Sequence, residues 1–222
     1  MLVKRFTNNW ESRRSALTTH VPVPTLRRLP LYYRELKRAA SQGLTHVSSK
    51  TLGERVGVPA VQVRKDMSYL DQKGRPGVGY EAQSLAAHLR DFLGLASEKQ
   101  AVLVGVGNLG RALALYPGFH AYGLRIVGAF DNDLDKVGQR VGRLEILPVE
   151  ALGDIVARLQ VRVGIITTPA DAAQDIADAL VAGGIKGIWN FAPCRLAVPD
   201  GVFVKDEDLA VALAVLSHVV EQ

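Results

Sequence analysis

The chain has few of the residues that form cross-links, metal sites or membrane spans. Its 222 residues include a single cysteine, Cys194, so no disulfide can form within one chain and no cysteine-rich metal site is possible. Five histidines are scattered without the spacing of metal ligands, so we expect no metal site. No run of about 18 apolar residues is present, and the N-terminus lacks the apolar core of a signal peptide. We therefore expect a soluble, cytoplasmic protein.

Basic residues are concentrated in the first part of the chain. Residues 1–80 contain 15 Lys and Arg against 5 Asp and Glu, whereas residues 81–222 contain 12 against 17. This asymmetry favours a basic module joined to an acidic one, although a solvated basic surface is a simpler alternative. Residues 1–21 are polar and basic, and we expect them to form a flexible arm with no assigned role.

Residues 22–80 have the pattern of a small helical DNA-binding domain. A helix is expected over residues 30–43, and a short helix follows Ser48 and Ser49, either of which can cap its N-terminus. A third helix is expected over residues 59–71, where apolar residues recur on one stripe. The stripe consists of Ala60, Val63, Met67 and Leu70.

The polar side of the third helix would enter the major groove of DNA if these helices form a helix–turn–helix. Lysine and arginine there meet phosphates or guanine, and glutamine can read adenine. This side carries Gln62, Lys65, Asp66 and Tyr69, flanked by Arg64 and Ser68. The following residues suit a tight hairpin, or wing, because glycine allows close approach to the DNA backbone. The wing residues are Gly74, Arg75, Gly77 and Gly79.

A dinucleotide-binding pattern begins after a linking helix expected over residues 81–98. A buried strand over residues 101–105 leads into Gly105-Val106-Gly107-Asn108-Leu109-Gly110. In this G-x-G-x-x-G spacing the glycines turn the chain, admit a pyrophosphate and pack a helix on a strand. A second strand ends at Asp131, about 20 positions later, where a ribose-binding acid is expected. Because a carboxylate there would repel a 2′-phosphate, we predict NAD(H) rather than NADP(H).

Strands and helices alternate beyond the second strand, which predicts a parallel Rossmann-type sheet over residues 99–205. Strands are expected over residues 161–169 and 186–193, with a helix over residues 171–184 between them. Residues at the carboxyl ends of these strands would line a nicotinamide pocket. They are Thr167, Thr168, Pro169, Asn190, Phe191, Ala192 and Pro193.

An apolar helix is expected over residues 206–222, and its apolarity exceeds what covering a small sheet requires. It would pack on a second subunit, including by exchange between protomers, unless it closes its own domain. The predicted fold class is α/β: an N-terminal winged-helix domain over residues 22–80, followed by a Rossmann-type parallel sheet domain with a C-terminal swapped helix.

Motifs from both modules, taken in order, resemble the Rex family of redox-sensing repressors. The basic module contributes RRLPLYYREL, QVRKDMSYL and GVGY, and the second module contributes GVGNLG, YPGF, FDNDLDKVG and IKGIWNFAP. The resemblance covers residues 22–220. It implies a homodimeric repressor that holds operator DNA when NADH is low and releases it when NADH rises. It also implies that NADH and NAD+ are ligands rather than redox substrates.

The resemblance assigns roles to individual residues. It implies that Tyr116 lies beside the nicotinamide and that Asp131 holds the adenosine ribose. It implies a switch of Arg28, Tyr116 and Asp208, in which Arg28 and Asp208 pair in one state and exchange partners with Tyr116 in the other. A plain phosphate contact is the alternative role of Arg28. Asn132 and Lys136 complete the candidate nucleotide site. The candidates for DNA contact are Arg28, Tyr32, Ser48, Ser49, Gln62, Arg64, Lys65, Tyr69, Lys73, Arg75, Gly77, Gly79 and Tyr80.

Two places depart from the family pattern. Pro76 stands directly before GVGY, where the family carries a basic residue, and proline has neither a side-chain charge nor a backbone donor. Leu70 and Asp71 replace an aromatic residue and a glycine. These differences leave DNA binding as the expectation and leave the operator sequence open.

We therefore predict a transcriptional repressor and not an enzyme, with no catalytic residues. An NAD-dependent dehydrogenase is the first alternative, and it would need an acid or base beside the nicotinamide. The sequence has no His–Asp or Tyr-x-x-x-Lys arrangement, although Tyr116 could act as an acid. A regulator that responds to another nucleotide, such as a coenzyme A-like ligand, is the second alternative.

Overall fold

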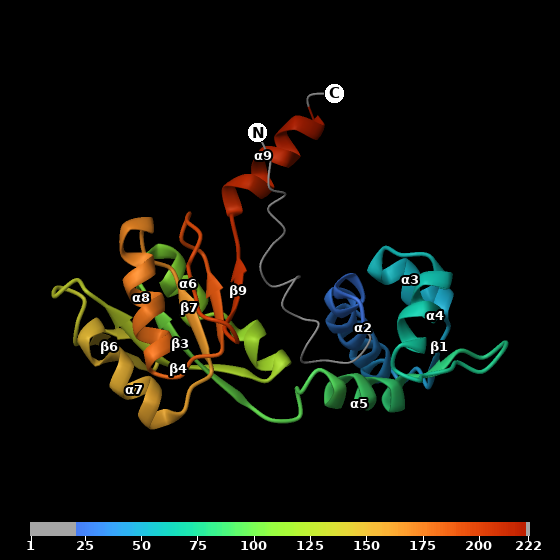
Figure 1. The fold of residues 1–222 in the computed structure, drawn as a ribbon. Coiled ribbons are helices and arrows are strands. Elements are labelled where there is room, and N and C mark those ends of the chain that lie inside the picture. The colour runs from blue at the N-terminus through green and yellow to red at the C-terminus, as the bar shows by residue number, and fades with distance from the viewer. Residues whose placement is uncertain (1–20, 221–222) are drawn as a thin grey trace. The chain divides into compact units, whose positions relative to one another are not determined.

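The computed structural model describes residues 21–220, without the side chains of residues 212, 215 and 219, so the expected N-terminal arm lies outside the described residues except for Val21. The described chain divides into two compact units, with the boundary between Ser97 and Glu98 (Figure 1).

The first unit is a small helical domain with a short two-stranded sheet. Strand β1 pairs with β2 in antiparallel fashion, with Val47 opposite Tyr80. The elements are α2 (Val23–Ser41), β1 (His46–Val47), α3 (Ser49–Val56), α4 (Ala60–Ser68), β2 (Tyr80–Glu81) and α5 (Ala82–Phe92). The loop between α4 and β2 is the predicted wing, so the unit has the winged-helix architecture expected from the sequence.

Helix α5 belongs to the core of this first unit. Its residues Leu85 and Leu89 are buried and pack in the same cluster as Leu29 and Leu36 of α2. Helix α5 is therefore packed within the first unit, and the linking role expected for residues 81–98 stays a prediction. An apolar stripe identifies a helix that is buried on one side, but it does not identify the partner against which the helix packs.

Two helix boundaries differ from the sequence prediction. Helix α2 begins at Val23 rather than at residue 30, because Pro24 lies in the first turn, where a missing backbone donor is harmless, and Pro30 is accommodated inside the helix. Helix α4 ends at Ser68 rather than at residue 71. Asp71 has a positive φ of 55°, and the N–H of Gln72 returns to the carbonyl of Met67, which closes the helix.

The second unit is built on a seven-stranded sheet of order β5-β6-β4-β3-β7-β8-β9. All neighbouring strands are parallel except β5 and β6, which are antiparallel. The strands are β3 (Lys99–Val104), β4 (Leu124–Asp131), β5 (Arg140–Val141), β6 (Leu144–Pro148), β7 (Val163–Ile166), β8 (Gly187–Asn190) and β9 (Phe203–Asp206). The chain order reverses at β3, the arrangement that leaves a ligand crevice at the carboxyl ends of the central strands.

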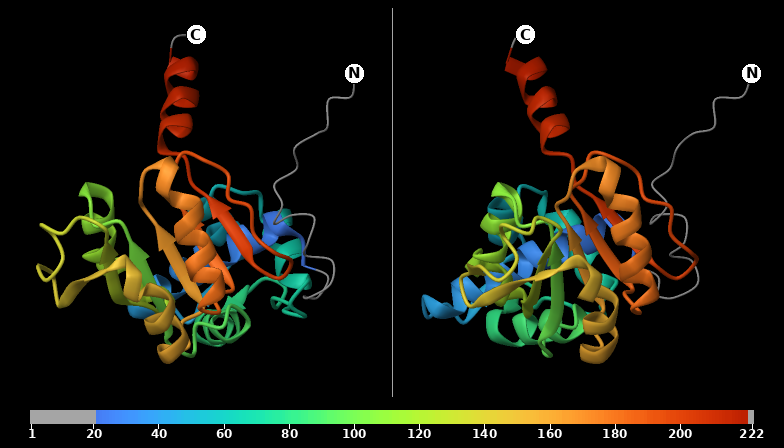
Figure 2. Two further views of the ribbon diagram at one scale, coloured as in Figure 1. Left: turned by 60° about the vertical axis from the view of Figure 1, so that its left-hand side comes forward. Right: turned by 90° about the vertical axis from the view of Figure 1, so that its left-hand side faces the viewer.

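Helices cover both faces of this sheet (Figure 2). Helix α6 (Asn108–Ala114) packs on one face, and α7 (Leu152–Leu159) and α8 (Ala170–Ala182) pack on the other. Two short 3-10 helices, η2 (Pro117–Tyr122) and η3 (Val149–Ala151), lie in the connections. This three-layer arrangement confirms the predicted Rossmann-type domain.

Helix α9 (Leu209–Val220) projects from the end of the second unit (Figure 2). Apolar side chains on it are more than half exposed, namely Leu209, Val211, Leu213, Leu216 and Val220. Twelve residues are too few to cross a bilayer, and among residues 21–220 no helix is both long and apolar enough to do so.

Candidate functional site

The glycine-rich loop follows β3 at the point where the strand order reverses. Gly105 has a positive φ of 95°, and a side chain there would lie 2.8 Å from the backbone of Thr167. A side chain on Gly110 would collide with the carbonyl oxygen of Gly105. The first and third glycines are therefore required by the folded loop itself, as the G-x-G-x-x-G spacing predicted.

The second glycine of the loop faces open space. A Cβ atom built on Gly107 meets nothing within 4 Å, so the fold alone does not require glycine at this position. The hydroxyl of Thr168, beside the loop, is buried and has no hydrogen-bond partner within the described structure. Because buried polar groups are normally satisfied, this hydroxyl fits a ligand atom. An open glycine and an orphan hydroxyl are the features that a bound pyrophosphate would use.

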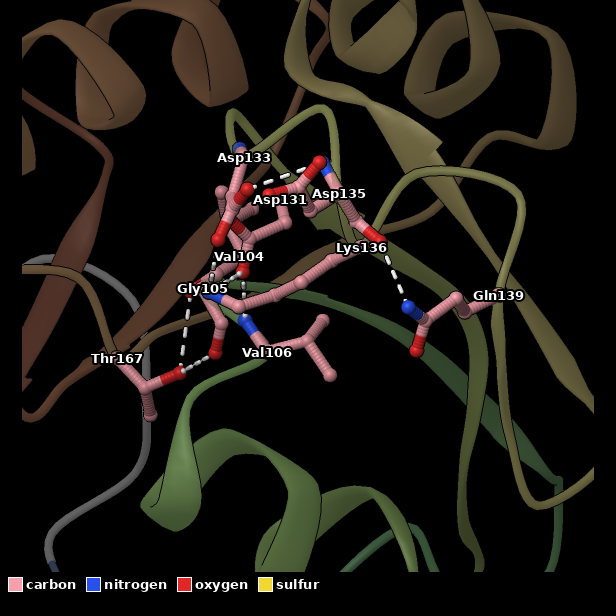
Figure 3. A network of polar contacts seen from close by, with 9 residues as sticks. All are labelled: Val104, Gly105, Val106, Asp131, Asp133, Asp135, Lys136, Gln139 and Thr167. Atoms are coloured by element: carbon pink, nitrogen blue, oxygen red, sulfur yellow. Dashed lines mark hydrogen bonds and ion pairs between the residues drawn. The ribbon is translucent and has the colours of Figure 1, made fainter.

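Thr167 fixes the loop to the end of β7 (Figure 3). Its hydroxyl lies 2.6 Å from the carbonyl oxygen of Gly105 and 3.1 Å from that of Val104. The single hydroxyl proton is donated to one of these carbonyls at a time, and either bond ties the end of β7 to the end of β3.

Asp131 ends β4 and points back to the glycine loop (Figure 3). Its carboxylate accepts hydrogen bonds from the backbone N–H of Val106 at 2.7 Å and that of Asp133 at 3.0 Å. Burial alone would raise the pKa of Asp131, but these bonds and Lys136 hold it below its usual value. The carboxylate is therefore ionised at neutral pH and joins the loop to the strand that carries the predicted ribose acid.

Lys136 bridges two of these carboxylates. Its Nζ lies 3.2 Å from Oδ2 of Asp131 and 3.3 Å from Oδ2 of Asp133. Partial burial lowers the pKa of Lys136, but the two carboxylates outweigh this effect and raise it. The cation is thus held beside the predicted ribose position, where it offsets part of the negative charge of Asp131.

Tyr116 and its neighbours form an aromatic row that begins after α6, the helix that follows the loop. The ring of Tyr116 is 56% exposed and folds over Gly118, where any side chain would collide with it. Its centroid lies 5.1 Å from that of Phe119, in an edge-to-face arrangement. An exposed ring held in this way is available to a planar ligand group.

Asn190 does not present its side chain to a ligand. It is fully buried, and its amide donates to Asp206 at 2.9 Å and to the carbonyl of Cys194 at 2.8 Å, while its oxygen accepts from the N–H of Ala192. Because internal partners already satisfy this side chain, the predicted place of Asn190 in the lining of the nicotinamide pocket would rest on its backbone, and it stays a prediction. Among the other predicted pocket residues, Ala192 is buried, Phe191 is partly buried, and Pro169 and Pro193 are exposed.

Helix α4 presents a basic outer face. Arg64, Lys65 and Ser68 are exposed, and Arg64 reaches across to donate to the hydroxyl of Ser49 at 3.0 Å. Ser48 accepts from the backbone N–H of Thr51 and caps α3, as predicted. Val61, in the first turn of α4, is 63% exposed on the same face. The sequence did not single it out because valine is usually a core residue, although its offset from the buried stripe indicates an exposed position.

Asp66 lies on the buried side of α4, contrary to the sequence prediction. Its side chain has no solvent exposure and receives hydrogen bonds from helix α2 and from its own helix. The donors are Thr25 at 2.9 Å, Nε and Nη2 of Arg28 at 2.6 and 2.7 Å, Tyr32 at 2.7 Å and Gln62 at 2.9 Å. The helical pattern predicted an exposed Asp66 because charged residues normally face solvent. Its burial is possible because four polar side chains bind its carboxylate.

The same network corrects one predicted DNA contact and constrains two others. Tyr32 is fully buried and gives its hydroxyl to Asp66, so the prediction that it contacts DNA was wrong. Gln62 and Arg28 are only partly exposed, and both are oriented by Asp66. Tyr80 was also predicted to contact DNA, but it is buried at 6% exposure in the core of the unit.

The wing has a rigid tip. The N–H of Val78 donates to the carbonyl of Arg75 at 3.1 Å, and Gly77 has a positive φ of 74°, which is the arrangement of a type II turn with Pro76 in its preferred place. Gly79 closes the base of the tip, where a side chain would collide with the carbonyl oxygen of Val47. Between the wing and α4 lies a groove of about 450 Å³, lined by Ser48, Ser49, Arg64, Gly74, Arg75, Pro76, Gly77, Val78, Gly79 and Tyr80.

Asp208 stands at the start of α9. Its Oδ1 accepts hydrogen bonds from the backbone N–H of Ala210 at 2.9 Å and that of Val211 at 3.1 Å, so it caps the helix. Of the predicted switch residues, Tyr116 and Asp208 belong to the second unit and Arg28 belongs to the first, where its partner is Asp66.

The remaining candidates lie in loops or near helix ends and differ in exposure, and Val106 among them is buried. Asn108 and Asn132 are exposed near the loop and the end of β4, and Leu109 and Val106 lie within the loop and its helix. Lys73 and Arg75 are exposed in the wing, and Tyr69 is half-buried at the end of α4.

Comparison with known proteins agrees with this two-site arrangement. Residues 96–194 match the family model of a CoA binding domain, and residues 20–68 match that of a DNA-binding protein N-terminus. The redox-sensing transcriptional repressor Rex of Desulforamulus reducens is 46% identical over 197 residues, which are 89% of this chain and 94% of the relative. The protein of the same name from Chloroflexus aggregans is 43% identical over 197 residues, or 89% of this chain and 93% of the relative.

Solved structures are similar along most of the chain. A crystal structure of RSP with β-NAD+ and operator DNA has a TM-score of 0.86 and 36% sequence identity, and the match covers 91% of this chain and 94% of RSP. A crystal structure of RSP with β-NADH has a TM-score of 0.81 at the same identity, covering 91% and 95%.

Proposed function

The chain belongs to the Rex family of redox-sensing transcriptional repressors, and we propose that it is a repressor that releases its operator DNA when NADH binds. The observation that carries this proposal is the presence, in one chain, of a basic helix with a wing and of a dinucleotide loop with an acid at the end of the next strand. This function needs no catalytic acid or base, because ligand binding alone can shift the protein between two states.

The loop and Asp131 support NADH and NAD+ as the ligands. The open space at Gly107 admits a pyrophosphate, and the unpartnered hydroxyl of Thr168 offers it or the neighbouring ribose a hydrogen bond. The ionised carboxylate of Asp131 would accept from ribose hydroxyls, and it would repel a 2′-phosphate. Lys136 weakens this repulsion, so we expect preference for NADH over NADPH to be finite rather than absolute.

Helix α4 and the wing support double-stranded operator DNA as the macromolecular partner. Arg64, Lys65 and Arg75 are exposed on the two elements that border one groove, where they would meet phosphates or guanine edges. Val61 would add an apolar contact on the same face, such as one with a thymine methyl.

Homodimerisation and the switch complete the proposal. The exposed apolar side chains of α9 would be covered by a second copy of this chain, which would space two recognition helices on one face of the DNA. Arg28 uses Nε and Nη2 on Asp66, and Asp208 uses Oδ1 to cap α9. Their other atoms, Nη1 and Oδ2, would form the exchanging contacts with each other and with Tyr116. We place this repressor in the cytoplasm.

The test is a titration of operator binding with nucleotides. Binding of the full chain to double-stranded operator DNA would be measured by fluorescence anisotropy with NADH, NAD+, NADPH and coenzyme A added in turn. We expect NADH to weaken binding at least about fivefold, the lower end of usual allosteric coupling, and NADPH to need a higher concentration. Operator affinity unchanged by NADH would overturn the sensing role, and release by coenzyme A alone would favour the second alternative. Oxidation of NADH by the protein with a small acceptor would favour a dehydrogenase.

A further inference from the structure

We propose that Trp189 and Glu207 are positioning residues that couple the nucleotide pocket to the base of α9. The proposal rests on the proposed function and names the side chains through which a nucleotide at Tyr116 would reorient the C-terminal helix. All of these residues lie in the second unit.

A continuous row of aromatic rings leads away from Tyr116. Centroids of Tyr116 and Phe119 lie 5.1 Å apart, those of Phe119 and Trp189 lie 5.9 Å apart, and those of Trp189 and Phe191 lie 4.6 Å apart. The first two contacts are edge-to-face, at interplanar angles of 74° and 72°. Because neighbouring rings are closely packed, a shift of one ring changes the space available to the next. Displacement of Tyr116 by a ligand would therefore reach Trp189.

Trp189 is bonded to the segment between β9 and α9. Its indole Nε1 donates to Oε2 of Glu207 at 3.3 Å. The neighbouring residue on β8, Asn190, receives the backbone N–H of Glu207 at 2.8 Å and donates its amide to Asp206 at 2.9 Å. Trp189 and Asn190 of β8 thus bind Glu207 and Asp206 of the segment. These bonds connect the aromatic row to the residues just before α9.

Glu207 has a second partner. Nζ of Lys205 lies 3.0 Å from the same Oε2 that accepts from Trp189. When the indole moves away, the carboxylate keeps an ion pair and is not left without a partner, so the change costs little free energy. The carboxylate oxygen can therefore lose the indole and keep Lys205, and this would give the junction the second arrangement that coupling requires.

A small change at Glu207 is transmitted to the whole helix. The next residue, Asp208, caps α9 through two backbone N–H groups, so the cap and the helix move as one body. A helix of 12 residues is about 18 Å long, and a few degrees of rotation at its base would displace its far end by an ångström or more. If α9 packs on a second copy, this displacement changes the spacing of the DNA-binding units.

The experiment measures coupling and binding separately. The dissociation constant of NADH would be determined for the full chain without and with saturating operator DNA, and the ratio of the two constants is the coupling factor. We expect a coupling factor of at least about 5 for the wild type. Trp189→Phe and Glu207→Ala should each reduce this factor below about 2. The fold-change in the NADH affinity of the DNA-free protein should be smaller than the fold-change in the coupling factor. Glu207→Gln keeps an acceptor for Trp189 and should keep most of the coupling.

The controls separate coupling from charge and from stability. Glu145→Gln removes an exposed carboxylate on β6, which lies toward the opposite edge of the sheet from β8. This control should leave the coupling factor unchanged. Wild-type coupling in both Trp189→Phe and Glu207→Ala would overturn the inference, as would an equal loss of NADH affinity with and without DNA. If Glu207→Ala does not fold, Trp189→Phe decides alone. A wild-type factor of 1 would instead overturn the proposed function.

Discussion

Asp66 is a carboxylate without solvent access that four side chains from two helices stabilise. Arg28 provides a bidentate charge-assisted contact, and the remaining donors satisfy the other lone pairs. The burial of Asp66 therefore fixes the angle between the recognition helix and α2. It also orients Arg28 and Gln62, so the shape of the DNA-binding surface depends on a residue that cannot touch DNA.

Substitution Asp66→Asn should destabilise the first unit. An amide in this place leaves Arg28 without its counter-charge and replaces one acceptor oxygen by a donor, and the loss of one partner of a buried ion pair costs about 3 kcal/mol or more. The measurement is chemical denaturation of the full chain, followed by circular dichroism. Asp71→Asn is the matched control, because Asp71 is exposed and its positive φ suits asparagine. Equal stability of the two variants would contradict the structural role of Asp66.

The same carboxylate should give the protein an acid-sensitive transition. Burial alone would raise the pKa of Asp66, but its hydrogen bonds from Arg28, Tyr32, Gln62 and Thr25 hold the pKa below its usual value. A carboxyl whose pKa is lower in the folded state contributes stability above its unfolded pKa of about 3.9, and this stability is lost as pH falls through the folded pKa. Denaturation measured from about pH 5 down to about pH 2, which covers the unfolded pKa and the region below it, should show a shallower acid loss in Asp66→Asn than in the wild type.

At the scale of elements, the glycine loop and the helices illustrate which features a sequence predicts. The loop was predicted correctly because most of its requirements are local: the positive φ of Gly105 and the contact between Gly110 and the carbonyl of Gly105 arise within a few residues. The destination of α5 and the burial of Asp66 and Asn190 were missed because they depend on partners distant in sequence. Helix α2 was predicted too short because proline at Pro30 was read as a boundary.

Alanine substitutions in the loop should separate folding from ligand binding. Gly107→Ala should fold with wild-type stability, because its Cβ meets nothing within 4 Å, but should weaken NADH binding at least about tenfold, since the methyl occupies space for the pyrophosphate. Gly110→Ala should instead lower the melting temperature, because its Cβ collides with the carbonyl of Gly105. Thermal melts and NADH titrations of both variants check this, and normal NADH affinity in Gly107→Ala would argue against a pyrophosphate at this loop.

At the scale of the whole molecule, helix α9 leaves the second unit incomplete. Five large apolar side chains on it are more than half exposed, and exposed apolar surface of this kind normally marks an interface. Hydrogen bonds from Asn190 to Asp206 and from Glu207 to Asn190 fix the segment that leads into α9. The molecule that binds an operator is thus expected to be a pair of chains, with α9 as the element they share.

Removal of residues 209–222 should convert the protein to monomers. We expect light scattering after size exclusion to give twice the chain mass for the full chain and the single-chain mass for the truncated one. Operator affinity should fall at least about a hundredfold in the truncated chain, because two half-sites can no longer be occupied together. The control variant Arg143→Glu reverses one exposed charge and should stay dimeric. A dimeric truncated chain would show that another surface joins the subunits.

The aromatic row has an optical consequence. The sequence contains two tryptophans, Trp10 and Trp189, and Trp189 lies in the row that begins at Tyr116. Tryptophan emits at the wavelengths that reduced nicotinamide absorbs and that oxidised nicotinamide does not. With Trp10→Phe, a single fluorophore would remain, and its emission would be quenched by energy transfer only when the bound nucleotide is reduced. The residue proposed to transmit the redox state would then also report it as light.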